Sequence, residues 1–418
     1  MNDRQKNILI PKLRFPEFKE SGEWEEKKLE GLITEIKEKT VINNQYTILS
    51  SSKSGIYIQN EYFKKQTASK NNVGYKIIKR GEFTYRSMSD NGNFTFNIQD
   101  KVDIGIVSPA YPVFKIKNKQ INAKWLYYYL NNTNKIKIQL LKTKQGSTRY
   151  ALKYKTFSEF KVDIPPQPAE QQKITSCLSS LDELLEAHKQ KLELLKAHKK
   201  GLMQNLFPQE GEKVPKLRFP EFKDSGEWEE KKLGEVTIKI GDGIHTTPKY
   251  DENGKFYFIN GNNLVDSKIY VDSKTKRVSQ EEFEKHKMDL TEQTILLSIN
   301  GTIGNVAYYK NEKVILGKSA CYINPNEDLN TVFLFYILQS SKINNYFLSE
   351  LTGSTIKNLS LKSIRETKIN LPSKQEQQKI AECLSSVNEL ITAEAEKIEQ
   401  LEKHKKGLMQ GLFPEMNE

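Results

Sequence analysis

The sequence predicts an α+β protein in which two α/β domains with mixed or antiparallel sheets are separated by two long helices that form an antiparallel coiled coil. Three observations predict this class. The chain has 418 residues, more than one hydrophobic core usually serves. Whole segments recur 204 to 206 positions apart, and one recurring pair carries heptad patterns. The duplication implies an internal pseudo-twofold relation.

A lead segment opens each copy. PKLRFPEFKESGEWEEKKL begins at Pro11 and PKLRFPEFKDSGEWEEKKL begins at Pro215, with 18 of 19 residues identical. Trp24 and Trp228 lie within these leads, and we expect each to pin the first strand of its domain. A repeat of this kind has to be recognised first, because it decides the architecture.

A variable block of about 130 residues follows each lead, and the two blocks share a similar order of predicted strands and helices but little sequence identity. Alternating apolar and polar runs such as TFNIQDKV, YPVFKIK, KFYFING and NVAYYK predict strands. KWLYYYLN and VFLFYILQ predict matching short amphipathic helices. Each block ends in a Gly-Ser-Thr segment, at Gly146 and at Gly353.

Two long helices close the copies. Residues 170–208 align without gaps on residues 376–414, with 25 of 39 identical. We therefore predict a first domain at 1–163, a first spacer helix at 164–208, a second domain at 209–370 and a second spacer helix at 371–418.

Apolar residues step by four and three along both helices, which is typical of a coiled coil. The predicted seam consists of Ile174, Leu178, Leu181, Leu185, Leu192, Leu195, Leu202, Ile380, Leu384, Val387, Ile391, Ile398, Leu401 and Leu408. The seam alone fits either direction of pairing. An antiparallel pair places His188 opposite Ile398, whereas a parallel pair places it opposite Glu394. We predict the antiparallel pair on functional grounds, and expect Lys199 and Lys405 to weaken the seam.

Composition limits the functional classes. The formal net charge of +12 favours a polyanionic partner such as nucleic acid. Three cysteines, Cys177, Cys321 and Cys383, cannot form a disulfide framework. Neither a signal peptide nor a membrane span is indicated, so we expect a cytoplasmic protein.

Catalytic motifs are absent from the sequence. It contains no glycine-rich phosphate loop, no HExxH and no nucleophile elbow. IPPQP at Ile164 lacks the residues of an amino-methyltransferase motif. The Glu-x-Lys triplets at Glu17 and Glu221 lack the paired carboxylate of a nuclease. We therefore expect no catalytic residues and no bound metal.

Polar and basic residues gather at the turns of both variable blocks. Arg, Lys, Asn and Gln can recognise base edges in the major groove, and Ser and Thr suit phosphates. In the first block the DNA-binding candidates are Lys53, Arg86, Ser87, Asn91, Lys144, Gln145, Thr148, Arg149 and Tyr150. In the second block they are His245, Thr246, Thr247, Lys249, Tyr250, Asn260, Asn262, Asn300, Thr302, Ser354, Thr355, Lys357 and Asn358.

For any one of these residues taken alone, ordinary turn chemistry is the better explanation. His245 could also be a metal ligand, but it has no neighbouring ligands at suitable spacing. DNA contact is the better interpretation of the clusters taken together, on a basic chain with two unlike blocks.

The order of variable block, GST segment and EQQKI helix, used twice, resembles the DNA-specificity subunit of type I restriction-modification enzymes. The most telling matches are DGIHTTPKY at 242–250, GSTIKNLSLKSIRETKINLP at 353–372 and the two helices at Glu170 and Glu376. The first block departs from the family in lacking the DGxHxTPxY pattern.

The resemblance implies that each block is a target recognition domain for one half of a split, asymmetric DNA sequence. It implies helices that set the spacing of the halves and bind two modification (methyltransferase) subunits, with restriction (motor/nuclease) subunits joining them. Methylation is then expected at adenine N6. S-adenosylmethionine, ATP and magnesium are expected on the partner subunits, with no cofactor on this chain.

Two other classes stay open. A non-enzymatic coiled-coil adaptor with two protein- or glycan-binding modules would lack the salt-dependent DNA affinity of a phosphate-neutralising protein. An autonomous methyltransferase or nuclease would bind S-adenosylmethionine or metal by itself.

Overall fold

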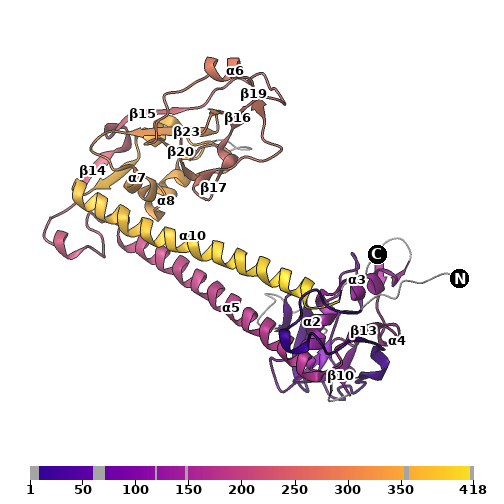
Figure 1. Cartoon of the computed structure of the whole chain (residues 1–418). Coiled ribbons are helices and arrows are strands. Elements are labelled where there is room, and N and C mark those ends of the chain that lie inside the picture. Colours follow the sequence, from indigo (N-terminus) through magenta and orange to yellow (C-terminus); the bar gives the residue numbers. More distant parts are fainter. Residues whose placement is uncertain (1–8, 60–70, 118–119, 146–148, 353–356, 415–418) are drawn as a thin grey trace. The chain divides into compact units, whose positions relative to one another are not determined.

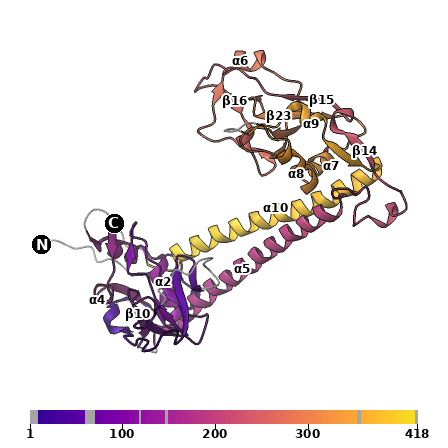
Figure 2. The same ribbon diagram turned by 180° about the vertical axis from the view of Figure 1, so that it is seen from behind.

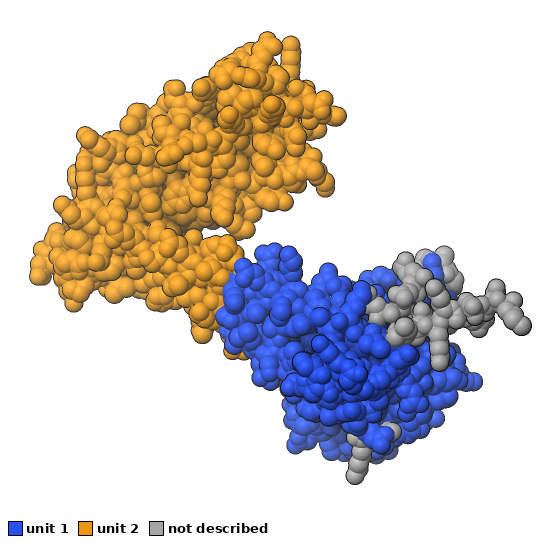
Figure 3. Space-filling model, viewed as in Figure 1, with its two compact units in different colours: residues 1–189, 397–418 blue, residues 190–396 orange. Residues whose placement is uncertain are grey.

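The computed structural model describes residues 9–59, 71–117, 120–145, 149–352 and 357–414. The chain forms two compact units, coloured separately in Figure 3. Unit 1 comprises residues 1–189 and 397–418, and unit 2 comprises residues 190–396. Each unit therefore contains one variable block, the first part of the long helix that follows this block in sequence, and the last part of the other long helix.

Unit 1 is a mixed α/β unit. Its strands are β1 (Glu25–Lys28), β2 (Ile33–Glu35), β3 (Thr47–Ser52), β4 (Gly55–Ile58), β5 (Lys76–Lys79), β6 (Phe83–Thr84), β7 (Met88–Ser89), β8 (Asn97–Ile98), β9 (Ile104–Val107), β10 (Val113–Ile116), β11 (Lys144–Gln145), β12 (Arg149–Ala151) and β13 (Lys161–Ile164). Its short helices are α2 (Ala123–Asn132), α3 (Asn134–Leu141) and α4 (Tyr154–Ser158).

Unit 2 repeats this plan with local changes. Its strands are β14 (Glu229–Lys232), β15 (Thr237–Asp242), β16 (Phe256–Ile259), β17 (Leu264–Val265), β18 (Lys268–Ile269), β19 (Arg277–Val278), β20 (Ile295–Ser298), β21 (Val306–Tyr308), β22 (Val314–Leu316), β23 (Ala320–Pro325) and β24 (Lys368–Leu371). Its short helices are α6 (Gln280–Lys285), α7 (Thr331–Ile337), α8 (Ser341–Ser349) and α9 (Leu361–Arg365).

The sheets of the two units correspond. A four-stranded sheet has the order β2-β10-β6-β8 in unit 1 and β15-β23-β20-β21 in unit 2. A second sheet is β4-β3-β9-β5 in unit 1 and β19-β16-β22 in unit 2. Within the second sheets β3 runs parallel to β9 and β16 runs parallel to β22, whereas their other pairings are antiparallel. The predicted α/β blocks with mixed sheets are confirmed.

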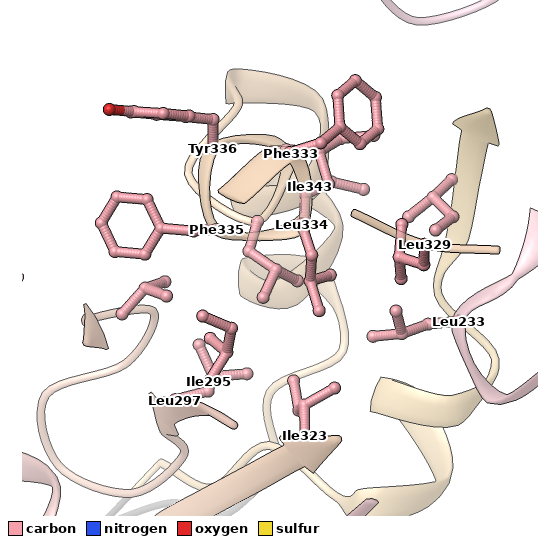
Figure 4. Packing of buried hydrophobic residues seen from close by; sticks show 14 of the residues in the cluster. Leu233, Ile295, Leu297, Ile323, Leu329, Phe333, Leu334, Phe335, Tyr336 and Ile343 are labelled. Carbon is pink, nitrogen blue, oxygen red and sulfur yellow. The ribbon is translucent and has the colours of Figure 1, made fainter. Parts of the chain in front are cut away.

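Each unit has its own main hydrophobic core. In unit 2 Leu334 of α7 points toward Ile295 of β20 and Ile323 of β23, as Figure 4 shows. Trp228 and Phe207 belong to the same core, and Trp24 and Phe413 occupy the corresponding core of unit 1. Both tryptophans are 2% exposed, directly before β1 and β14, in the place expected from the sequence.

The EQQ sequence at the start of each long helix forms a joint with the variable block. The Asn122 side chain caps α2 by accepting from the Trp125 backbone N–H at 3.0 Å. Its backbone N–H donates to Gln171 Oε1 at 2.9 Å, and its Nδ2 donates to Gln172 Oε1 at 2.8 Å. Asn330 makes the same contacts with Gln377 and Gln378 at the start of α7.

The glutamate of each EQQ sequence binds an arginine of the lead. Arg14 donates from Nε and Nη2 to the two oxygens of Glu170, both at 2.8 Å, and from Nη1 to the Gly22 carbonyl. Arg218 binds Glu376 and the Gly226 carbonyl in the same way. These bidentate pairs are nearly buried, so the copied lead and the copied helix form one structural element in each unit.

The long helices are α5 (Pro168–Asn205) and α10 (Lys374–Gly411), and they lie side by side in Figures 1 and 2. In unit 1 Lys189 binds Glu402 at 2.6 Å and Asp182 binds Lys405. In unit 2 Lys191 binds Glu394 at 2.9 Å and Lys199 binds Asn388 at 2.7 Å. Partner numbers fall along α10 as they rise along α5, so the pairing is antiparallel.

The seam differs in burial along its length. Ile174 and Leu178 are buried in the core of unit 1, and Ile380 and Leu384 in that of unit 2. The other predicted positions range from buried to partly exposed, because two helices that pack only on each other leave the edges of their seam open to solvent. These positions are Leu181, Leu185, Leu192, Leu195, Leu202, Val387, Ile391, Ile398, Leu401 and Leu408. Lys199 and Lys405, expected to weaken the seam, each have a polar partner across it.

Both helices end three residues before a proline, at Asn205 and Gly411. A search of the described residues finds no helix with the length and apolar character needed to span a membrane.

Candidate nucleic-acid interface

In unit 1 the candidate residues lie on three neighbouring segments. Lys53 is in the turn between β3 and β4, and Arg86 and Ser87 link β6 to β7. Lys144 and Gln145 form β11, whereas Arg149 and Tyr150 lie in β12. Antiparallel pairing in the order β11-β12-β7 sets Lys144 opposite Tyr150, and Tyr150 opposite Ser89. Thr148 lies outside the described residues.

A surface cavity of about 230 Å³ brings three candidates together. Lys53, Arg86 and Asn91 line it from the β3–β4 turn and from both sides of β7. The remaining lining residues are Ser51, Ser52, Met88, Ser89, Asp90, Asn93, Phe94 and Thr95. Ser89, Asp90, Asn93 and Thr95 were not among the candidates, although they surround Asn91 in the polar sequence SDNGNFT.

The charges around this cavity are mostly basic and unneutralised. Arg149 lies 3.8 Å from Asp90, and both side chains are largely exposed. Within the described part of the chain, no carboxylate lies within ion-pair distance of Lys53, Arg86 or Lys144. These three cations are therefore available to phosphate or guanine oxygens.

A buried amide and a glycine fix the shape of the site. Asn97 is 3% exposed, and its Nδ2 donates to Ser51 Oγ at 2.8 Å and to the Ser52 carbonyl at 2.9 Å, which holds the end of β3. Gly92 has a φ of +78°, and a Cβ there would lie 3.1 Å from the Tyr150 ring. Only glycine allows this turn to pass so close to the ring.

In unit 2 the candidates meet around a short turn, Gly317–Ser319, that follows β22. Ser319 Oγ donates to Asn260 Oδ1 at 3.0 Å and accepts from the Gly261 backbone N–H at 2.9 Å. A Cβ at Gly261 would lie 2.6 Å from the Ser319 carbonyl oxygen, so glycine is required for this approach. Ile244, the neighbour of His245, pairs with Gly317 as an isolated bridge.

Other candidates of unit 2 adjoin the same turn. The Ile299 backbone N–H donates to the Ser319 carbonyl at 3.0 Å, which places Asn300 beside it. Asn300 pairs with Asn358, and the Gly301 N–H donates to the Lys357 carbonyl. Asn262 and Thr302 are exposed nearby in sequence, in the segments that carry Asn260 and Asn300. Ser354 and Thr355 lie outside the described residues.

His245 binds the carboxylate of Asp242, with 2.7 Å between Nε2 and Oδ2. Thr246 and Thr247 follow it in an exposed segment. Among the described residues, no three His, Cys, Asp or Glu side chains lie close enough together to hold a metal ion.

Lys249 and Tyr250 contact a different part of unit 2. The Lys249 backbone N–H donates to Glu282 Oε1 at 3.2 Å, and Tyr250 pairs with Val278. This hydrogen bond, together with the charges of Lys285 and His286, holds the pKa of Glu282 below its ordinary value. This division could not be predicted from the sequence, because the contacts lie about 30 residues further along the chain.

Lys318 was not a candidate, yet it is exposed at the centre of the turn that joins His245, Asn260 and Asn300. The signal was present in LGKSA, a polar turn directly after an apolar strand.

The two sites occupy the same place in the repeated fold. The Leu152 backbone N–H donates to the Ser87 carbonyl in unit 1, and the Leu359 N–H donates to the Ile299 carbonyl in unit 2, both at 2.8 Å. Each contact joins the segment after the GST motif to the segment after a central strand, β6 or β20. Equivalent positions thus display different polar side chains.

Comparison with known proteins agrees with this duplication. The sequence profile of the type I restriction modification DNA specificity domain matches residues 21–197 and again residues 225–403. The chain belongs to this family.

Similar proteins include the specificity subunit of the type I restriction enzyme MjaVIII from Methanocaldococcus jannaschii. It is 27% identical over 317 residues, which cover 73% of this chain and 72% of the relative. The type I restriction-modification S subunit from M. genitalium has a crystal structure that covers 98% of this chain and all of its own, with 16% identity and a TM-score of 0.60. A structure from work on type I complex assembly and conformational transition covers 94% of this chain and 97% of its own, with 16% identity and a TM-score of 0.52. The fold is therefore that of type I specificity subunits.

Proposed function

We propose that this type I specificity subunit recognises a two-part, asymmetric DNA sequence, with one half bound by each unit. The observation that carries the proposal is the pair of unlike polar sites at equivalent places in the fold. Similar backbones with different side chains suit two different base sequences. Lys53 and Arg86, which have no carboxylate within ion-pair distance among the described residues, add the electrostatic attraction to phosphates that DNA binding requires.

The chain directs chemistry that its partners perform. Two modification subunits methylate adenine N6, using S-adenosylmethionine, after the adenine is turned out of the duplex. Restriction subunits, with ATP and magnesium, cleave the DNA. The specificity subunit supplies recognition and position, and contributes no catalytic residue.

The repeated framework is the proposed docking surface for the two modification subunits. Leu184 of α5 and Leu390 of α10 occupy equivalent helix positions, and both are exposed. Leu194 is also exposed, but its equivalent is Gln400. A partner that binds twice in the same way needs surface residues that occur twice, which favours Leu184 and Leu390.

The paired helices set the spacing between the two half-sites. Each helix has 38 residues and is about 57 Å long at 1.5 Å per residue. Half-sites read from one face of DNA lie about 34 Å apart, or one helical turn. A stiff antiparallel pair, held in each unit by its EQQ joint, keeps such a spacing constant.

A genome-wide map of N6-methyladenine in the host, with and without this chain, tests the proposal. We expect deletion to remove methylation from one bipartite motif and no other. An unchanged map, in cells that express the methyltransferase partner, would contradict the proposal and favour a non-enzymatic adaptor.

A further inference from the structure

Unit 2 contains a basic cavity away from the proposed DNA-binding residues. It has a volume of about 390 Å³ and lies between α5, α10 and the junction of α7 with α8. Three lysines of α5 line it, spaced by three and one residues so that they share one helix face: Lys196, Lys199 and Lys200. Its other lining residues are Met203, Gln204, Gln339, Ser340, Ser341, Asn388 and Ile391.

Lys199 is the most enclosed of the three lysines. Its Nζ donates to the neutral amide of Asn388 at 2.7 Å and lies 5.5 Å from the centre of the Tyr336 ring. Burial lowers the pKa of this ammonium group, because the charged form loses hydration. Of the other two, Lys196 binds Glu193 at 2.9 Å on its own helix.

The equivalent place in unit 1 has the same frame but is internally neutralised. Lys405 lies over the Tyr128 ring, as Lys199 lies over that of Tyr336. Its partner across the helices is Asp182, at the position that Asn388 occupies in unit 2.

A second position also carries a more positive side chain in unit 2 than in unit 1. The position equivalent to Lys196 is Glu402, which binds Lys189 in unit 1. Lys200 has a counterpart of its own kind in Lys406. Both differences at the lining positions therefore make the unit 2 cavity more positive than its counterpart.

We propose that the cavity lined by Lys196, Lys199 and Lys200 binds a phosphate monoester or inorganic phosphate. After Glu193 is counted, the three lysines leave a charge of about +2, which matches the charge of about −1.5 to −2 on such a group at pH 7. A carboxylate or a DNA phosphodiester carries one negative charge only. Lysines bind phosphate as point charges, without the fixed fork of arginine.

The first amides of α8 complete the cavity. Ser340 caps this helix by accepting from the Ile343 backbone N–H, so the N–H groups of Ser341 and Lys342 stand at its start. Amides at a helix N-terminus favour an anion. Met203 and Ile391 add an apolar part to the lining of the cavity.

Isothermal titration of the full-length chain with inorganic phosphate, at constant ionic strength in chloride buffer, tests the proposal. We expect one site per chain. Asn388→Asp introduces the residue that unit 1 uses, and Lys200→Glu reverses a lining charge. Each should weaken phosphate binding about tenfold or more. Lys406→Glu is the matched control at the equivalent position of unit 1, and should leave phosphate affinity unchanged.

Two further ligands identify the chemical group. AMP carries a phosphate monoester and should compete with inorganic phosphate, whereas cyclic AMP, a diester of single charge, should not. No binding to the wild-type chain would overturn the proposal, and so would equal binding by N388D, by K200E or of cyclic AMP. Circular dichroism of each variant confirms that a loss of binding is not a loss of fold. Because the readout needs no DNA, its outcome is independent of the proposed recognition function.

Discussion

Replacing Arg14 by methionine should strongly destabilise unit 1. Methionine keeps an unbranched apolar stem but removes the guanidinium group that binds Glu170 through two hydrogen bonds of 2.8 Å. The Glu170 side chain is 1% exposed, so its charge cannot recover hydration where it stands. Trp24 Nε1, at 3.3 Å, is then its remaining hydrogen-bond partner among those found in the described residues.

The expected cost follows from this burial. Removing one partner of a buried ion pair costs about 3–5 kcal/mol, because the other charge is left uncompensated. For a unit of this size, such a change lowers the melting temperature by roughly 6–20 °C. The first turns of α5 should also exchange amide hydrogens faster, because Glu170 lies in the first turn of this helix.

A double-mutant cycle separates the pair from the packing of each side chain. In Arg14→Met/Glu170→Met both charged groups are gone, so most of the lost stability should return. Arg218→Met and Arg218→Met/Glu376→Met repeat the cycle in unit 2, where the side chains are 7% and 1% exposed. Differential scanning calorimetry gives the melting temperatures, and hydrogen exchange assigns them to a unit. A loss below about 1 kcal/mol for R14M, or a double variant as unstable as R14M, would refute the reasoning.

Four further predictions concern stability, the seam and assembly. The Trp24→Phe substitution should cost about 1–2 kcal/mol more than Trp228→Phe in chemical denaturation, because Trp24 Nε1 donates to Glu170 whereas Trp228 Nε1 is buried with no partner among the described residues; equal costs would contradict this. Hydrogen bonds from Lys135 and then Lys161 lower the pKa of Glu26 from 4.5, so its stabilising effect is present above that pH and is lost as the pH falls through the lower, folded-state pKa. Glu26→Gln should therefore make unit 1 lose less stability between about pH 5 and pH 3 than the wild type, and parallel acid titrations of the two proteins would disprove it. Leu184→Asp and Leu390→Asp should each reduce the amount of modification subunit that co-purifies with the chain, whereas Leu194→Asp, the control at another exposed leucine, should not. If L194D alone reduced the co-purified modification subunit, the twofold docking surface would be ruled out. Deleting residues 190–196 together with the facing residues 390–396 should shorten the DNA spacer between the half-sites by about 3 base pairs, since seven residues of helix span about 10.5 Å. An active complex that methylates sites with an unchanged spacer would show that the helices do not set the spacing.

Much of the fold could be predicted because its signals are local and repeated. The heptads of α5 and α10 and the alternation of apolar and polar residues in the strands each act over a few residues. The direction of helix pairing could not be derived from the seam. It depends on polar partners such as Asp182 with Lys405, which are 223 positions apart.

The roles of the EQQ sequences could not be predicted either, because their partners are also distant in sequence. Gln171 and Gln172 are unremarkable helix residues in sequence, and their partner Asn122 lies about 50 positions earlier. The duplication marked the segment as shared framework without indicating what it binds.

The sequence predicted that polar residues would cluster at the candidate sites, but not which residues belong to each site. Lys53, Arg86 and Asn91 line one cavity, as expected of residues that act together. The sequence LGKSA marks Lys318 as part of a polar turn after an apolar strand. That this turn lies beside Asn260 and Asn300 is a result of the fold and could not be predicted from the turn itself. Which of these side chains contact bases stays a prediction.

The most direct test of recognition by halves is a map of N6-methyladenine in hosts that carry single-unit variants. One host carries Arg86→Ala with Asn91→Ala, and another carries Asn260→Ala with Lys318→Ala. If each unit binds its own half, the first host should show a changed or relaxed sequence in one half of the motif only, and the second host in the other half only. Loss of both halves from one folded variant, or an unaltered motif in both hosts, would contradict the claim that two unlike sites recognise two unlike half-sequences.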